Sequence, residues 1–343
     1  MGRDLTLYPQ KATKTELKKY IESLGFHPCN HLWDWPAGTQ NYSWFDYNDY
    51  KSIDGVSADI YPVDKSENVY TKNEWALHVR NLYSASIFDV KMLNTVLRGA
   101  RKLFGGTITG DYGTNKYAPL WEDKSTPLSR GISCVYRKTT NSLEALKFTL
   151  PDEIMDKQYN EKNTNKKDAE LYNIIKQHEP TRILYNGLVP FLVAIIEYFF
   201  SEVFIILLKY DKNGKEKIKN HNQKIDFQLL IKIKSDNITL EEIIASNYTF
   251  QNLDQITRAY KDWVNIDIKK ILFTRKRIGN KIKFLENRLF ELIQYRHSVV
   301  HHLFIDRNLS KVKFIELVNI IEKTIEEITC FLEKKYIFKI DRY

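Results

Sequence analysis

The sequence predicts two parts, an α+β domain followed by an all-α helical bundle. Two observations support this fold class. The first half contains five of the six tryptophans and most of the glycines, and several of its segments alternate polar and apolar residues as half-buried strands do. In the second half, apolar residues recur at helical spacing over long segments. The 343 residues, of which 43% are hydrophobic, are enough for two cores.

Helices and strands are predicted to mix in residues 1–150. A first helix spans residues 13–24, with Thr15 as its candidate N-cap. A second helix spans residues 89–104 and ends at Gly105, because glycine can adopt the left-handed conformation that closes many helices. Four segments have the pattern of strands: residues 56–61, 75–80, 107–109 and 132–136.

A polar stretch separates the two predicted domains. Residues 151–180 include an Asn- and Lys-rich run at 160–167, which lacks the apolar side chains that a packed core requires. We therefore expect a linker or a leading helix here. It would join a domain of residues 1–150 to a second domain of residues 181–343.

Residues 183–208 are long and apolar enough to span a membrane. However, Glu197 and Glu202 lie inside this segment, and a carboxylate near the centre of a bilayer is energetically costly. The segment is therefore predicted to be the central helix of a bundle, surrounded by its neighbours. A membrane span is the alternative. Further helices are predicted over residues 239–246, 252–263, 267–302 and 311–335.

Composition favours an anionic partner and a reducing compartment. The chain has 52 basic and 43 acidic residues, a formal net charge of +9, and nucleic acid is the commonest partner of such an excess. AT-rich genomes also encode Lys-rich proteins without this role. The three cysteines are far apart and form neither a disulfide framework nor a metal-ligand pattern, which favours the cytoplasm. The first residues lack the apolar core of a secretory signal.

One predicted helix carries the most informative pattern in the sequence. Four of its residues fall on one stripe: Leu285, Leu289, Leu292 and Arg296. Arg296 thus extends an apolar face, and a buried guanidinium needs a carboxylate or a phosphate as its partner. Glu197 or Glu202 is the predicted partner within the protein. His297 and His301 are four residues apart and flank the same edge of the stripe.

The run from Tyr295 to His302 resembles the signature of the HEPN superfamily. That signature is an arginine, a polar residue, three further residues and a histidine, and Arg296, His297 and His301 fill these places. The surroundings agree with the family pattern, with a long apolar helix first, then an insert, a short helix, a long helix that ends in the motif and a closing amphipathic helix. The resemblance covers residues 183–335 and implies an all-α HEPN helical bundle.

The resemblance implies a metal-independent endoribonuclease that uses no cofactor. Arg296 would bind the scissile phosphate, while His301 and His297 would transfer protons at the ribose 2′-hydroxyl and the leaving 5′-oxygen. Glu197 and Ser298 would support these groups. The products would be a 2′,3′-cyclic phosphate and a 5′-hydroxyl. The resemblance also implies a homodimer in which two motifs face one cleft.

A basic segment precedes the motif on the same predicted helix. It contains Arg275, Lys276, Arg277 and Lys281, several turns before Arg296. These side chains could guide an RNA backbone towards the cleft. A solvated charged face with no ligand is the alternative.

Three other interpretations are open at this point. Arg296 could belong to a structural ion pair, and His301 could be a satisfied core histidine. His297 and His301 could bind zinc, although the sequence offers no third ligand nearby. The module could also bind RNA or nucleotides, or act as a scaffold, without cutting. The presence of both Arg296 and His301 favours the enzyme.

Proteins that resemble this arrangement, a variable N-terminal domain on a HEPN module, tend to be bacterial abortive-infection or toxin components. By that analogy we expect a cytoplasmic antiviral effector that cuts tRNA or mRNA and needs no membrane. The first half would sense a phage product or restrain the nuclease. An antitoxin is a further candidate partner.

Overall fold

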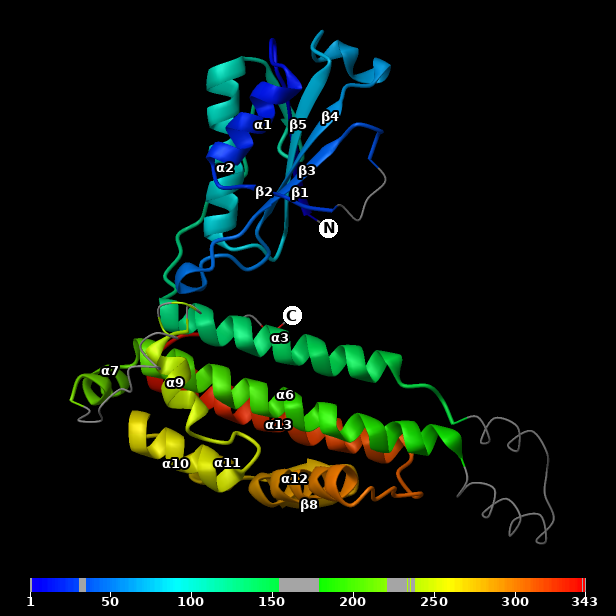
Figure 1. The fold of residues 1–343 in the computed structure, drawn as a ribbon, viewed down its shortest axis with the longest axis vertical. Coiled ribbons are helices and arrows are strands. Elements are labelled where there is room, and N and C mark those ends of the chain that lie inside the picture. Colours follow the sequence, from blue (N-terminus) through cyan, green and yellow to red (C-terminus); the bar gives the residue numbers. More distant parts are fainter. Residues whose placement is uncertain are drawn as a thin grey trace, which may run out of the picture. The chain divides into compact units, whose positions relative to one another are not determined.

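The computed structural model describes residues 2–30, 35–153, 179–220, 233, 235, 238–340 and 342. The chain divides into two compact units, Met1–Arg130 (unit 1) and Gly131–Tyr343 (unit 2), and Figure 1 shows the fold of each. The division falls earlier than the predicted boundary at residue 150. Most of the predicted linker at 151–180 lies outside the described residues.

Unit 1 is built on a six-stranded sheet with the order β2-β3-β4-β5-β1-β6, in which all neighbouring strands are antiparallel. Its strands are β1 (Gly2–Tyr8), β2 (His27–Pro28), β3 (Gln40–Trp44), β4 (Val56–Pro62), β5 (Trp75–Leu82) and β6 (Thr107–Gly110). The strands predicted at 56–61, 75–80 and 107–109 are confirmed. Two short 3-10 helices, η1 (Asn48–Tyr50) and η2 (Lys65–Val69), lie in the connections.

Helices α1 (Lys14–Ser23) and α2 (Ile87–Phe104) lie on the same side of this sheet (Figure 1). Their apolar faces pack with alternate residues of the central strands, such as Leu5 and Val79, into one core. The N-cap of α1 is Thr13, and not Thr15 as predicted, because the Thr13 side chain forms a capping box with Glu16. Gly105 ends α2 with a φ of 62°, as the sequence indicated.

Unit 2 is mostly helical in its described part. Its helices are α3 (Pro127–Thr149), α6 (Pro180–Tyr210), α7 (Lys212–Lys219), α9 (Leu240–Ser246), α10 (Leu253–Val264), α11 (Ile268–Leu272), α12 (Leu285–His301) and α13 (Lys311–Tyr336). The helices predicted near 239–246, 252–263 and 311–335 are confirmed. Two short strands, β7 (Arg275–Ile278) and β8 (Lys281–Phe284), form a separate hairpin.

The strand predicted at residues 132–136 is wrong, because this segment lies inside α3. A five-residue window with alternating apolar residues also fits part of a helix. The longer pattern identifies the helix, since buried residues follow one another at intervals of three or four: Leu128, Ile132, Val135, Thr139 and Leu143.

Helix α6 is the central helix of unit 2, as predicted. It packs against α7, α9, α10, α12 and α13, and it runs beside α13 in Figure 1. Its ends confirm that α6 and α13 are parallel, since Asp211 after α6 accepts a hydrogen bond from Tyr336 at the end of α13. Within the described residues, α6 is the one helix whose length and composition would also allow a membrane span. It is not buried all round, because Ile183 and Phe191 are exposed.

The prediction of one helix over residues 267–302 is wrong. The chain forms α11, then the β7–β8 hairpin, and only then α12. Helix α11 ends at Leu272, and the hairpin turns at Gly279-Asn280, where Gly279 has a φ of +59° and Asn280 does not have a positive φ. This is the conformation in which glycine is favoured at the first position of a hairpin turn.

Candidate functional site

Helix α12 places Arg296 on its buried stripe, as the sequence predicted. Leu285, Leu289 and Leu292 are completely or almost completely buried. Arg296 follows them one turn later and is half-buried, so its side chain leaves the core at the edge of the bundle. The helical period alone therefore identified which face of α12 carries the guanidinium.

The predicted carboxylate partners of Arg296 are wrong. Glu197 instead accepts a hydrogen bond from Gln251 at 2.7 Å. It lies eleven residues beyond Asn186 on α6, about 16 Å along the helix axis, whereas the last turn of α12 reaches Asn186. Glu202 lies still farther along α6; burial raises its pKa, and Lys138 opposes this effect.

The Nε atom of Arg296 is buried and has no hydrogen-bond partner in the part of the chain that the structure describes. Arg296 also forms no ion pair there. A buried guanidinium nitrogen without a partner is costly, because it has lost its hydration and gained nothing in return. The arrangement suits an anionic oxygen supplied from outside these residues.

The predicted histidines lie together at the end of α12. The ring centroids of His297 and His301 are 4.5 Å apart, and those of His297 and His302 are 5.6 Å apart. All three imidazoles are exposed to solvent. The Ser298 hydroxyl, predicted to support them, donates to the Gln294 carbonyl one turn earlier. Helix α12 thus brings the histidine rings together and leaves them open to a ligand, with Arg296 on the same last turns of the helix.

The end of α12 is closed by a turn with a residue in the left-handed backbone conformation. The Phe304 amide donates to the Ser298 carbonyl, and Leu303 between them has a φ of 51°. A non-glycine residue in this conformation costs about 1–2 kcal/mol. The turn leaves three apolar side chains in succession exposed beside the histidines: Leu303 at 83%, Phe304 at 50% and Ile305 at 46%.

Asn186 on α6 holds this end of α12 in place, and the sequence interpretation missed it. Its Oδ1 accepts from the Tyr295 hydroxyl at 2.7 Å and from the Asp306 amide at 2.9 Å. Its Nδ2 donates to the carbonyls of Arg182 and Asp306. Burial raises the pKa of Tyr295, which keeps the hydroxyl a donor. The available signal was a lone amide inside an apolar helical segment, which must find partners when buried.

Arg182 reinforces the same junction. Its guanidinium donates to the Arg307 carbonyl at 2.5 Å and lies 3.6 Å from the Glu153 carboxylate. Both Arg182 and Glu153 are almost completely buried. The loop that follows the motif is therefore held to the start of α6 by the side chains of Arg182 and Asn186, which donate to its backbone carbonyls.

The predicted RNA-binding residues lie on the β7–β8 hairpin, and not on the same helix as Arg296. Lys276 forms an ion pair with Glu327 of α13. Arg275, Arg277 and Lys281 are exposed. Because the hairpin leads directly into α12, these residues lie near the start of that helix, and Arg296 lies near its end.

A metal site is not apparent in the described part of the chain, where no group of three or more His, Cys, Asp or Glu side chains could hold an ion. Comparisons of this chain with protein-family models, with curated proteins and with solved structures return no match.

Proposed function

We propose that unit 2 is a metal-independent endoribonuclease whose active site is Arg296, His297 and His301. The single observation that carries the proposal is the unpartnered, buried Nε of Arg296 on the same last turns of α12 as the exposed imidazoles of His297 and His301. Arg182, a structural arginine, also has a buried unpartnered Nε, but its other guanidinium nitrogens contact Arg307 and Glu153 within the fold. A phosphate-binding arginine has its partner in the substrate.

The three groups suit cleavage of RNA by its own 2′-hydroxyl. One imidazole takes the proton from the 2′-hydroxyl, whose oxygen attacks the phosphorus. The other imidazole, in its protonated form, donates a proton to the 5′-oxygen as the phosphorus–oxygen bond breaks. The guanidinium of Arg296 stabilises the negative charge that develops on the phosphate. The products are a 2′,3′-cyclic phosphate and a 5′-hydroxyl.

A second copy of the chain would complete this site. His297 and His301 are exposed, and an open site gives poor exclusion of water. Leu303, Phe304 and Ile305 form an exposed apolar segment directly beside them, of the kind that protein interfaces bury. We therefore propose a homodimer in which these segments pack and two motifs share one cleft.

The second candidate function is RNA or nucleotide binding without cleavage. One observation favours it: in the described residues, neither His297 nor His301 has a side-chain hydrogen bond that would fix its ring. A general base is usually oriented by a third group. Binding through Arg296 needs no such orientation.

The test is cleavage of end-labelled tRNA and mRNA in EDTA by wild type and by Arg296→Ala, Arg296→Lys, His297→Ala and His301→Ala. We expect wild type to leave cyclic-phosphate ends, with losses of at least about 100-fold in each variant. His302→Ala is the matched control, since His302 is an exposed neighbour without a proposed role.

Circular dichroism and light scattering establish that every variant keeps its fold and its oligomeric state. Equal cleavage by wild type and the Arg296 and His301 variants would contradict the nuclease. RNA binding without cleavage, lost in Arg296→Ala, would instead support the non-catalytic module.

A further inference from the structure

The β7–β8 hairpin has two faces of different character. Its register pairs Arg275 with Phe284 and Arg277 with Ile282. Cross-strand partners share a face, so these four side chains lie on the same side of the hairpin. Arg275, Arg277 and Ile282 are exposed, which makes this the outer face.

Part of the opposite face contacts the bundle, while Lys281 at its tip is exposed. It carries Ile278, which is buried, and Lys276, which pairs with Glu327 of α13. Lys283 lies on the same face and forms an ion pair with Glu291 at 2.7 Å. The carboxylates of Glu327 and Glu291 are thus engaged by lysines of the inner face.

Aromatic side chains stack on the outer face. The rings of Phe273 and Phe284 are parallel within 11°, with centroids 4.3 Å apart. The guanidinium of Arg275 lies 5.0 Å from the centroid of the Phe284 ring. Phe273 is 62% exposed. A ring that is already stacked on one side and open on the other offers a flat surface to a further planar group.

Charge on the outer face is of one sign. Arg275 and Arg277 form no ion pair within the residues that the structure describes. The carboxylate nearest to the turn is Glu316, which lies beside Gly279 at the tip. The face therefore combines an open aromatic stack with two uncompensated guanidinium groups, spaced two residues apart along β7.

We propose that this outer face binds single-stranded RNA. One base stacks on the open ring of Phe273, while Arg275 and Arg277 contact the phosphates that flank it, with Ile282 as an apolar wall. Stacking of this kind recognises the face of a base and tolerates any sequence. Bases in a duplex are already stacked on each other, so the surface selects single strands.

The position of the hairpin suggests what this binding does. That the ligand is RNA rests on the proposed function. Phe284 is the N-cap of α12, and Arg296 lies twelve residues later, about 18 Å along the helix. A few nucleotides of extended single strand cover such a distance. The hairpin would therefore direct cleavage to unpaired segments.

The experiment measures binding by fluorescence anisotropy, with oligonucleotides of about 12 nucleotides that are 2′-O-methylated throughout and so lack the nucleophile. The full-length wild type is titrated with a single strand and with a duplex of the same composition. The variants are Phe273→Ser, Phe273→Tyr and Arg277→Gln. Lys283→Gln, on the inner face of the same hairpin, is the matched control.

We expect wild type to prefer the single strand. Phe273→Ser should weaken binding of the single strand about 5- to 100-fold, because the ring is lost. Phe273→Tyr keeps an aromatic ring and should bind as wild type does. Arg277→Gln should lower the salt dependence of binding by about one counterion. Lys283→Gln should bind as wild type does.

Equal binding of duplex and single strand, unchanged binding by Phe273→Ser, or no RNA binding at all would overturn the proposal. If Phe273→Ser bound RNA as wild type does and a protein partner were found on this face, the surface would be assigned to protein docking instead. The two proposals fail separately. If wild type does not cut RNA but the Phe273 dependence holds, the binding surface stands alone. If wild type cuts RNA and Phe273→Ser binds normally, only the nuclease stands.

Discussion

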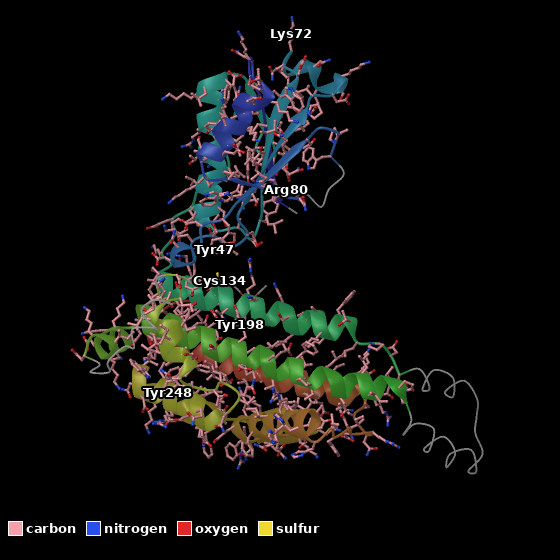
Figure 2. The ribbon with its side chains drawn as sticks, viewed as in Figure 1. Tyr47, Lys72, Arg80, Cys134, Tyr198 and Tyr248 are labelled. Carbon is pink, nitrogen blue, oxygen red and sulfur yellow. The ribbon has the colours of Figure 1, made fainter. Side chains whose placement is uncertain are left out.

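At the scale of single residues, the side chains of Arg296 and His78 have opposite surroundings. Arg296 in unit 2 has a buried Nε without a partner in the described residues. His78 in unit 1 lies between two carboxylates, with Nδ1 3.3 Å from Asp59 and Nε2 3.3 Å from Asp4. The carboxylate of Asp4 also lies 3.2 Å from Arg80, which Figure 2 labels on the sheet. His78 has its partners within the fold and so stabilises it. The Arg296 Nε has no hydrogen-bond partner in the described residues and so suits a ligand.

His78 makes the stability of unit 1 depend on pH. Burial lowers its pKa, but the hydrogen bonds to Asp4 and Asp59 outweigh burial, and the net shift is upward from 6.5. A raised pKa in the folded state gives stability that is fully present below the unfolded pKa. This stability is lost as the pH rises through the folded pKa.

We therefore expect the melting temperature of unit 1 to fall as the pH is raised from about 6 to about 8. In His78→Gln this dependence should be absent, because the titrating group is gone. Thermal unfolding followed by tryptophan fluorescence measures it. A wild-type curve that is flat over this range, or a His78→Gln curve that falls equally, would contradict the assignment.

At the scale of elements, the joint between α6 and α12 decides where the motif lies. Asn186 is 1% exposed and forms four hydrogen bonds that reach Arg182, Tyr295 and Asp306. Leu289 and Leu292 set which face of α12 is buried, but apolar contacts tolerate sliding along a helix. The directional bonds of Asn186 fix how far along α6 the last turn of α12 lies.

Asn186→Ala should lower the free energy of unfolding of unit 2 by about 2–4 kcal/mol, because it leaves buried donors and acceptors without partners. Tyr295→Phe removes one of these bonds and should cost about 1 kcal/mol. Urea denaturation followed by circular dichroism measures both. Gln294→Ala, an exposed position on the same helix, is the control and should change little. A loss in Asn186→Ala no larger than that of the control would refute the role of this joint.

At the scale of the whole molecule, the chain has two compact units with separate cores. Unit 1 contains an extended core that includes Leu93 and the central strands. Unit 2 is centred on α6, where residues such as Tyr198, labelled in Figure 2, also contact α3 through the cation–π pair with Lys138. Five of the six tryptophans lie in unit 1, and most of the helix lies in unit 2.

We expect the two units to unfold in separate transitions, since each buries its own apolar surface. Tryptophan fluorescence should report unit 1, and far-ultraviolet circular dichroism should report mainly unit 2. Leu93→Ala should shift the fluorescence transition by about 2–5 kcal/mol and leave the other transition in place. Coincident transitions that shift together would show one cooperative molecule instead.

The sequence by itself determined the class of the fold, the central place of α6 and the buried stripe of α12 that ends in Arg296. These properties follow from the spacing of apolar residues, because the period of a helix or strand places regularly spaced side chains on one face. The same reasoning failed for residues 132–136 and for the β7–β8 hairpin. A short window fits both periods, and the Gly279-Asn280 turn was not weighed against a helical pattern.

Only the tertiary structure decided which groups surround the motif. The spacing along α6 separates Glu197 from Arg296 by whole helical turns, although both lie on helices that pack together. Asn186, Tyr295 and Asp306 meet because two elements distant in sequence cross at that point. Partners of this kind depend on how helices are offset along one another, and apolar periodicity carries no information about that offset.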